Sequence, residues 1–160
     1  MSVTPSQTVG PYFQIGLIHE RWSSLAGNGE RITIEGSVLD AEGVPVTDAM
    51  IEIWQPDNKA FGRFATDPST GRFAFETSRP VSMGPDAAAH LCVGVFARGL
   101  LKRLYTRIYF DPTAINGNDP ILSLVPYARR PTLVAVSTGD RRYRFDIRFA
   151  GEGETVFLEC

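Results

Sequence analysis

A histidine and a cysteine two positions apart are the residues whose types and spacing first suggest chemistry. His90 and Cys92 lie in the apolar segment 90–98, and residues two apart on a strand point to the same face. An imidazole and a thiolate could both bind zinc, but zinc needs three or four ligands and the pattern supplies only these two. The alternative is structural, with His90 satisfied by a hydrogen bond in the core and Cys92 acting as a small buried hydrophobe.

The elements that would position these two residues are predicted to be β-strands. Apolar residues recur with a period of two, as at Ile32, Ile34 and Val38, which is typical of half-buried strands. Short segments of this kind, separated by turns with glycine and proline, indicate an all-β sandwich of two sheets. The eight predicted strands are residues 31–40, 50–55, 72–77, 90–98, 103–110, 132–138, 143–149 and 155–158.

The remaining segments are short. Residues 119–125 are predicted to form one or two helical turns, and residues 132–138 and 143–149 to form a hairpin around Gly139 and Asp140. Residues 1–30 lack regular alternation and are predicted to be an extended N-terminal arm, followed by the sandwich domain at residues 31–160. The strand at 90–98 is apolar on both faces, which predicts burial on both sides.

The composition excludes several classes of function. With 160 residues, 43% of them hydrophobic and 21% charged, the chain suits one globular domain. A net charge of -2 gives no electrostatic reason to bind nucleic acid or a membrane surface, and no apolar segment could span a bilayer. The sequence starts without signal-peptide features, and Cys92 and Cys160 form neither a disulfide framework nor a zinc motif. A cytoplasmic protein is therefore expected.

Four segments resemble the intradiol ring-cleavage dioxygenases, and in particular the alpha-type chain of the members built from two homologous chains. The most specific are Thr-Pro-Ser-Gln-Thr-Val-Gly-Pro-Tyr-Phe at 4–13 and the C-terminal stretch at 143–157. The segments 34–57 and 90–110 are similar to the family as well. Together the four segments span most of the chain, so the resemblance also implies the family's β-sandwich fold.

This resemblance implies an activity. Intradiol enzymes hold a non-haem ferric ion with two tyrosinates and two histidines, a ligand set suited to iron(III), and use O2 to open a catechol ring between its hydroxylated carbons. For the two-chain members it implies that protocatechuate becomes 3-carboxy-cis,cis-muconate in aromatic catabolism, in the beta-ketoadipate pathway. The iron belongs to the beta-type chain, which is expected to be this chain's partner in a higher-order oligomer.

The same resemblance implies that this chain holds no iron. His90 matches the first histidine ligand, but Cys92 occupies the second position, and no tyrosine lies between Trp54 and His90, where both tyrosine ligands are expected. An arginine and a glutamine of the iron-binding active site are replaced by Ala87 and Arg107. We therefore predict no metal ligand and no catalytic residue in this chain, with Fe(III) bound by the beta-type partner.

The resemblance assigns the arm and one arginine to the substrate cavity. The expected cavity-lining residues of the arm are Thr8, Gly10, Pro11 and Tyr12. A Gly-Pro pair makes a stiff backbone that can approach closely, and a tyrosine adds a flat apolar face with a polar tip. Arg98 is expected to receive the substrate carboxylate, by steering or by a charge-assisted hydrogen bond. Alternatively, the arm only fastens a dimer, and Arg98 is an exposed arginine or part of an interface ion pair.

Two other functions remain open from the sequence. A non-catalytic β-sandwich binding or interaction module is possible because the hairpin at 36–53 resembles generic sandwich modules, although such a module has no use for a specific arm. A transthyretin-like hydrolase also begins with such a hairpin. Its C-terminal Tyr-Arg-Gly-Ser signature is absent, because this chain ends in Phe-Leu-Glu-Cys.

Overall fold

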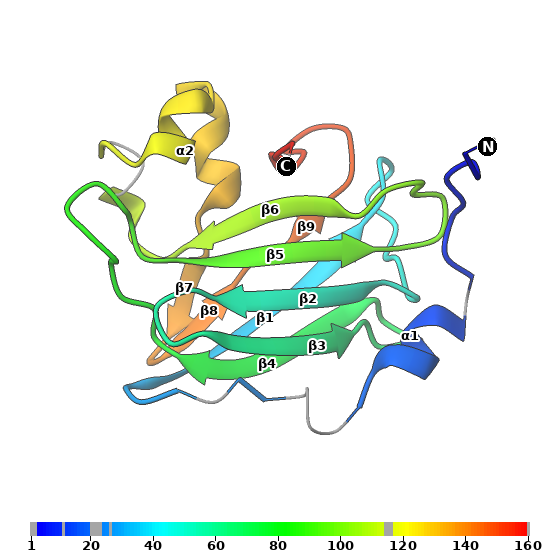
Figure 1. The fold of residues 1–160 in the computed structure, drawn as a ribbon, viewed down its shortest axis with the longest axis horizontal. Helices are drawn as coiled ribbons and strands as arrows, with labels where there is room; N and C mark the ends of the chain where they lie inside the picture. Colours follow the sequence, from blue (N-terminus) through cyan, green and yellow to red (C-terminus); the bar gives the residue numbers. More distant parts are fainter. Residues whose placement is uncertain (1–2, 11, 20–23, 26, 114–116, 160) are drawn as a thin grey trace.

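Two β-sheets pack face to face around a shared hydrophobic core (Figure 1), which confirms the predicted two-sheet sandwich. The structure, a computed structural model, describes residues 3–10, 12–19, 24–25, 27–113 and 117–159. One sheet has the order β4-β1-β8-β7 with β9 paired to β1, and the other has the order β3-β2-β5-β6. The elements are α1 (Tyr12–Leu17), β1 (Arg31–Leu39), β2 (Met50–Gln55), β3 (Ala60–Ala65), β4 (Arg72–Ser78), β5 (His90–Phe96), β6 (Leu104–Tyr109), α2 (Pro120–Leu124), the 3-10 helix η3 (Tyr127–Leu133), β7 (Val136–Gly139), β8 (Arg142–Arg144) and β9 (Ile147–Arg148).

The period-two alternation of the strands produces the core. In the four-stranded sheet, β2 and β5 are antiparallel and pair Ile51 with Val95 and Ile53 with Val93. All four side chains are at most 1% exposed. Since burying one aliphatic side chain contributes about 1.5–3 kcal/mol, rows of this kind stabilise the sandwich. They also fix the register, because a shift by one residue would turn every apolar side chain outward.

Most predicted elements are present, but one strand was missed. The predicted strands at 31–40, 50–55, 72–77, 90–98 and 103–110 are confirmed as β1, β2, β4, β5 and β6, and the helix at 119–125 as α2. The prediction omitted β3, whose sequence Ala-Phe-Gly-Arg-Phe-Ala contains a glycine and alternates weakly. It forms because it pairs along its whole length with β2, a contact that local propensity does not reveal.

The C-terminal third differs most from the prediction. Residues 132 and 133 belong to η3, which has Pro131 inside it, so the strand expected at 132–138 begins only at Val136. The hairpin around Gly139 is present, with β7 antiparallel to β8. Residues 155–158 form no strand, and only Leu158 makes an isolated bridge, to Tyr105 of β6.

The strand expected at 143–149 is interrupted between β8 and β9. At the break, Phe145 donates its backbone N–H to the carbonyl of Glu35, and Asp146 accepts the N–H of Ser37 at 2.9 Å. A Cβ added to Gly36 of β1 would lie 1.8 Å from the carbonyl oxygen of Phe145. Gly36 is therefore required because two backbones approach closely here.

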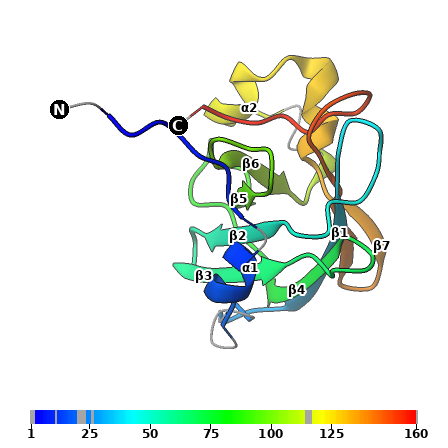
Figure 2. The same ribbon diagram turned by 90° about the vertical axis from the view of Figure 1, so that its right-hand side faces the viewer.

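The N-terminal arm runs away from the body of the sandwich in the view of Figure 2. Residues 3–10 have no regular secondary structure, but residues 12–17 form helix α1, so the arm is not extended throughout. Leu25 is fully buried in the core and anchors the segment that leads into β1. Within the described part of the chain, no helix is both long and apolar enough to span a membrane.

Candidate functional site

Strand β5 carries both residues whose spacing suggested metal chemistry. His90 and Cys92 lie near its start and face away from the core, and both are partly exposed. The prediction that this strand is buried on both sides is therefore wrong for these positions. The outer face of the sheet is bordered by α2 and the C-terminal segment rather than covered by a second layer, as the lining of a pocket on this face shows.

The imidazole of His90 is fixed by a backbone contact. Its Nδ1 lies 2.8 Å from the carbonyl oxygen of Ala88, and its ring centroid lies 5.7 Å from that of Tyr109 on β6. Burial lowers the pKa of His90 below its ordinary value of 6.5, so the ring is neutral at pH 7 and Nδ1 donates to the carbonyl. This geometry agrees with the structural interpretation of His90, that of a histidine satisfied by a hydrogen bond.

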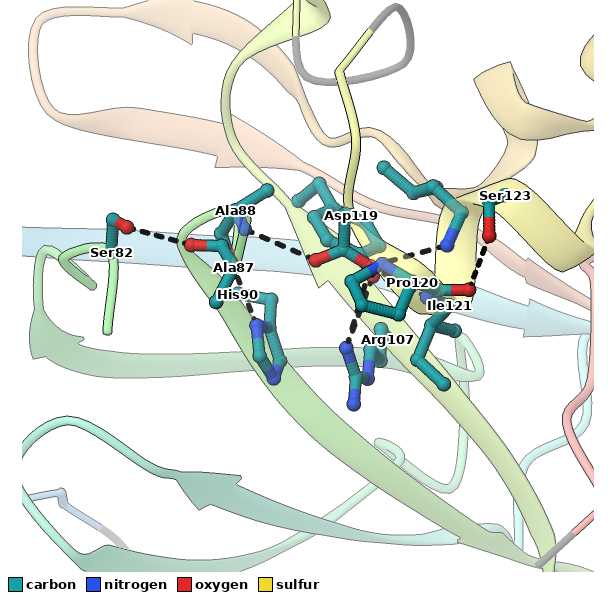
Figure 3. Close-up of polar contacts among 11 residues, drawn as sticks. Ser82, Ala87, Ala88, His90, Arg107, Asp119, Pro120, Ile121 and Ser123 are labelled. Atoms are coloured by element: carbon teal, nitrogen blue, oxygen red, sulfur yellow. Dashed lines mark hydrogen bonds and ion pairs between the residues drawn. The ribbon is translucent and has the colours of Figure 1, made fainter. Parts of the chain in front are cut away.

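Asp119 connects three elements beside His90 (Figure 3). Its Oδ1 accepts the backbone N–H groups of Ile121 at 2.9 Å and Leu122 at 3.1 Å, which caps α2. Its Oδ2 accepts the N–H of Ala88 at 3.0 Å, and the hydroxyl of Tyr109 donates to Oδ1 at 3.3 Å. The side chain is only 2% exposed. One buried carboxylate therefore ties α2 to β6 and to the segment that precedes β5.

The residues around His90 do not fit a ferric ion. Burial raises the pKa of Tyr109 to about 12, and its hydroxyl donates to Oδ1 of Asp119 at 3.3 Å. Arg107 pairs with Cys92 across β5 and β6 and places a fixed positive charge beside the second ligand position. Among the residues that the structure describes, no three histidine, cysteine, aspartate or glutamate side chains are grouped to hold a metal.

A pocket of about 380 Å³ opens on the outer face of the four-stranded sheet. Its floor includes one row of cross-strand neighbours, in which Phe61, Trp54, Cys92 and Arg107 come from β3, β2, β5 and β6. Trp54 is 41% exposed although it lies within a strand. Since Cys92 is small and its neighbours Trp54 and Arg107 are large, the row is hollow at its centre.

The next row is filled differently. Gly94 of β5 lies between Glu52 of β2 and Tyr105 of β6, and the side chain of Arg103 lies over it, since a Cβ added to Gly94 would be 3.0 Å from Cδ of Arg103. Ile121 of α2 and Leu158 of the C-terminal segment form further apolar walls. The small side chain of Cys92 therefore opens the pocket, and Arg103 over Gly94 forms part of its wall.

Glu52 is the charged centre of this face. Its Oε1 accepts from Arg63 at 2.9 Å, and its Oε2 lies 2.7 Å from Nη1 of Arg103. The Glu52 side chain is 11% exposed, whereas those of Arg63 and Arg103 are 26% and 35% exposed. The guanidinium of Arg103 also stacks 4.1 Å from the ring centroid of Tyr105. Both carboxylate oxygens are thus neutralised, and the three residues carry one net positive charge.

Only some of the predicted substrate-binding residues lie close together, and they do so at the C-terminal end of β5. The hydroxyl of Thr8 accepts the backbone N–H of Gly99 at 2.8 Å, directly after Arg98. Arg98 is 61% exposed and forms an ion pair with Asp48. The structure therefore brings Thr8 and Arg98 to the same turn. Gly10 is exposed, as is Tyr12 at 79%, whereas Pro11 lies outside the described residues.

The two groups of predicted residues are well separated. His90 begins β5 and Arg98 follows its end, so about 20 Å of strand lies between them at 3.3 Å per residue. Figure 1 shows β5 running from the side of α2 toward the side of the N-terminal arm. Within this chain, the arm and Arg98 do not border the positions of His90 and Cys92.

Sequence reasoning missed three residues that shape these regions. Asp119 carries the signature of a helix cap because Pro120 follows it at the first helical position, yet only the helix was predicted. Glu52 lies on the polar face of a correctly predicted strand, but one of its partners is on the omitted β3. Trp54 gave no signal of its own, because its exposure depends on the small residue opposite it.

Comparisons with known proteins place the chain in a family. No protein-family model matches the sequence. The chain is 38% identical to the protocatechuate 3,4-dioxygenase alpha chains of Burkholderia cepacia and Pseudomonas putida, over 98% of this chain and 96% of each of those proteins. It is also 30% identical to the protocatechuate 3,4-dioxygenase beta chain of Burkholderia cepacia, over 79% of this chain and 67% of that protein.

Solved structures support the fold. The dioxygenase domain of a dioxygenase–carbohydrate-binding protein fusion from Streptomyces sp. SirexAA-E has a TM-score of 0.63 and 22% identity, over 92% of this chain and 99% of that one. Hydroxyquinol 1,2-dioxygenase from Pseudomonas putida DLL-E4 has a TM-score of 0.61 and 20% identity, over 92% and 67%. The chain thus belongs to the intradiol dioxygenases, and within them it groups with the protocatechuate 3,4-dioxygenase alpha chains.

Proposed function

We propose that this chain is the alpha subunit of a protocatechuate 3,4-dioxygenase that is active only with a homologous beta subunit. The complex converts protocatechuate and O2 to 3-carboxy-cis,cis-muconate and acts in the cytoplasm. The observation that carries the proposal is the 38% identity to two alpha chains over 98% of this chain. Identity at that level over nearly both full lengths relates the whole chain to those subunits.

The beta subunit holds the iron(III) in this proposal. The 30% identity to a beta chain supports two homologous subunits that divide one task. The region of His90 supports the same division, since the hydroxyl of Tyr109 is hydrogen-bonded to Asp119, and Arg107 adds a positive charge opposite Cys92. An iron site in this chain would need ligands that these residues do not supply.

The contribution of this chain is structural support and part of the substrate cavity. Thr8, Gly10, Pro11 and Tyr12 border a cavity whose iron lies in the beta subunit. The contact between Thr8 and Gly99 supports this role because it joins the arm to the turn that carries Arg98, next to the packing of Phe13 on Phe96. Arg98 receives the substrate carboxylate at the same turn, and its 61% exposure leaves the guanidinium within reach of a ligand.

The test is co-expression of this chain with a beta-type chain, followed by an iron assay and by oxygen uptake with protocatechuate. We expect about one iron per alpha–beta pair and oxygen consumption only in the complex. The isolated chain should be colourless, because a tyrosinate–iron(III) site produces a burgundy absorption band. Stoichiometric iron and ring cleavage by the isolated chain would contradict the proposed division between subunits.

A further inference from the structure

Arg98, which receives the substrate carboxylate in the function proposed above, is exposed but has a fixed partner. Its Nε forms an ion pair with Oδ2 of Asp48, in the turn that precedes β2. The Asp48 side chain is 12% exposed, whereas that of Arg98 is 61% exposed. A largely buried carboxylate therefore holds a guanidinium that reaches into solvent.

The strand register places these two residues opposite each other. Strands β2 and β5 are antiparallel, and Met50 pairs with Phe96 at one end of their ladder. Continuing the same register by two residues brings Asp48 opposite Arg98, and residues two apart on a strand share a face. The ion pair is thus a cross-strand contact just beyond the last backbone pair of the ladder.

The backbone beside Asp48 is held in place. Ala49 is fully buried, and its N–H donates to the hydroxyl of Thr66 at 3.0 Å. The carbonyl of Ala49 accepts the backbone N–H of Thr66, also at 3.0 Å. Since both backbone groups of Ala49 are bound, the position from which the Asp48 carboxylate reaches Arg98 is fixed by the sheet.

The backbone beside Arg98 is held as well. Ala97 is fully buried, and its carbonyl accepts the N–H of Leu100 at 3.3 Å. Gly99 has a φ of 88°, which glycine adopts readily, and its N–H donates to the hydroxyl of Thr8. With the backbone fixed on both sides of the ion pair, the direction of the long Arg98 side chain depends on its rotamer and on Asp48.

The ion pair leaves one edge of the guanidinium open. Asp48 contacts Nε, and among the described residues the two Nη groups of Arg98 have no protein partner. These groups form the end of a planar fork that matches the two oxygens of a carboxylate. An arginine already held in one rotamer loses less freedom when it binds a ligand, so orientation by Asp48 raises affinity. The negative charge of Asp48 acts in the opposite direction, because it weakens the attraction of Arg98 for an anion.

We propose that Asp48 is a positioning residue that selects substrates with a ring carboxylate by acting through Arg98. The inference rests on the proposed function, in which Arg98 binds that carboxylate. Asp48 holds Nε so that the Nη groups face the ligand, and it does not contact the substrate itself. Its loss lowers the preference of the complex for protocatechuate over catechol and leaves ring cleavage intact.

The orientation of Arg98 can be measured without catalysis, by the nitrogen–proton heteronuclear NOE of its Nε–H in the isolated full-length chain. We expect an ordered Nε–H in the unmodified chain and in Asp48→Asn, whose amide oxygen still accepts a hydrogen bond. In Asp48→Ala the NOE should fall to that of Arg142, an exposed arginine of β8 without an ion pair among the described residues. Equal values for Arg98 in all three chains would overturn the proposal.

Steady-state oxygen uptake by the alpha–beta complex measures the effect on selectivity. Asp48→Ala should lower kcat/KM for protocatechuate about threefold to tenfold, the range for one arginine left mobile, and that for catechol less than about twofold. The loss should appear in KM, since the carboxylate is bound equally in the ground state and the transition state. Asp48→Asn should retain at least the unmodified value. The matched control Asp140→Ala, beside Arg141 on the other sheet, should leave both substrates within about twofold.

A double variant separates positioning from structural damage. If Asp48 acts through Arg98, Asp48→Ala has no further effect on the protocatechuate-to-catechol ratio once Arg98 is alanine. A further fall in that ratio, an equal loss with both substrates in Asp48→Ala alone, or an equal loss in Asp48→Asn and Asp48→Ala would overturn the proposal. A complex that does not cleave protocatechuate, although Asp48 orders Arg98 in the isolated chain, would contradict the proposed function alone.

Discussion

The polar side chains at the two ends of β5 differ in burial and in the number of their hydrogen-bond partners. At the start, Asp119 is 2% exposed and satisfies two backbone donors of α2, one donor before β5 and the hydroxyl of Tyr109. At the end, Arg98 is 61% exposed and has one ion pair, while Thr8 joins the arm to the same turn.

This contrast separates stability from recognition. A buried carboxylate that is fully hydrogen-bonded is costly to disturb, because each lost partner leaves a desolvated group. An exposed ion pair contributes little to folding, but its charge is available to a ligand or a partner. Changes at the start of β5 should therefore alter the free energy of unfolding, and changes at its end should alter catalysis by the complex.

Asp119→Ala should have the largest effect. It removes the cap of α2 and leaves the N–H of Ala88 and the hydroxyl of Tyr109 without their acceptor. The free energy of unfolding should therefore fall by about 2–4 kcal/mol. Urea unfolding of the full chain, followed by circular dichroism, measures this loss. The control Asp140→Ala, at a side chain 94% exposed, should change stability by less than about 0.5 kcal/mol. Equal losses in the two variants would contradict the role of Asp119.

Glu52→Gln should have the next largest effect. The change leaves Arg63 and Arg103 facing each other without their shared carboxylate, and both arginines are partly exposed, so water reduces the cost to about 1–3 kcal/mol. The same urea experiment measures it, with Glu76→Gln as the control for an exposed pair. If the two losses were equal, Glu52 would be an ordinary surface ion-pair partner.

Arg98→Ala should leave stability nearly unchanged and alter catalysis. In the alpha–beta complex we expect kcat/KM for protocatechuate to fall about tenfold, near the lower limit for a charge-assisted hydrogen bond. The value for catechol, which has no carboxylate, should change less than about twofold. Steady-state oxygen uptake with both substrates provides the comparison. An equal loss with the two substrates would argue that Arg98 supports the interface rather than the substrate.

Much of the fold was predictable because it depends on local alternation. Strands β1 and β2 alternate regularly and β5 is a continuous apolar run, and their predicted bounds agree with the structure to within two residues. The strand β3 was not predictable in this way, since Gly62 weakens its pattern and its pairing with β2 is a tertiary contact. The helix η3 was not predictable from local alternation either. It contains Pro131 and extends to Leu133, into a segment whose sequence alternates like a strand.

The features of the candidate site that could be predicted are those that depend on residue identity alone. The prediction that this chain lacks iron ligands rests on Cys92 and on the absence of tyrosine between Trp54 and His90, and it stays a prediction. The pocket could not be foreseen, because it depends on which side chains flank Cys92 and Gly94 across three strands. Arg98 was predicted as a ligand group, but its pairing with Asp48 requires the turn geometry. Register, rather than composition, determines these contacts.

The smallest effect should come from the protonation of His90, which tests how firmly the start of β5 is buried. Burial lowers the pKa of His90 in the folded chain below 6.5. Above pH 6.5 both states are neutral and stability does not depend on this group. Below it, the unfolded chain binds a proton that the folded chain resists, so stability falls as the pH drops toward the folded pKa.

Urea unfolding between pH 5 and 7.5 measures this dependence. The slope attributable to His90 cannot exceed one proton, or about 1.4 kcal/mol per pH unit. His90→Gln should remove that slope, whereas His19→Gln, which keeps His90, should retain it. If His90→Gln and the unmodified chain lost stability in parallel below pH 6.5, the imidazole would be hydrated in the folded state. The contrast between a buried start and an exposed end of β5 would then not extend to His90.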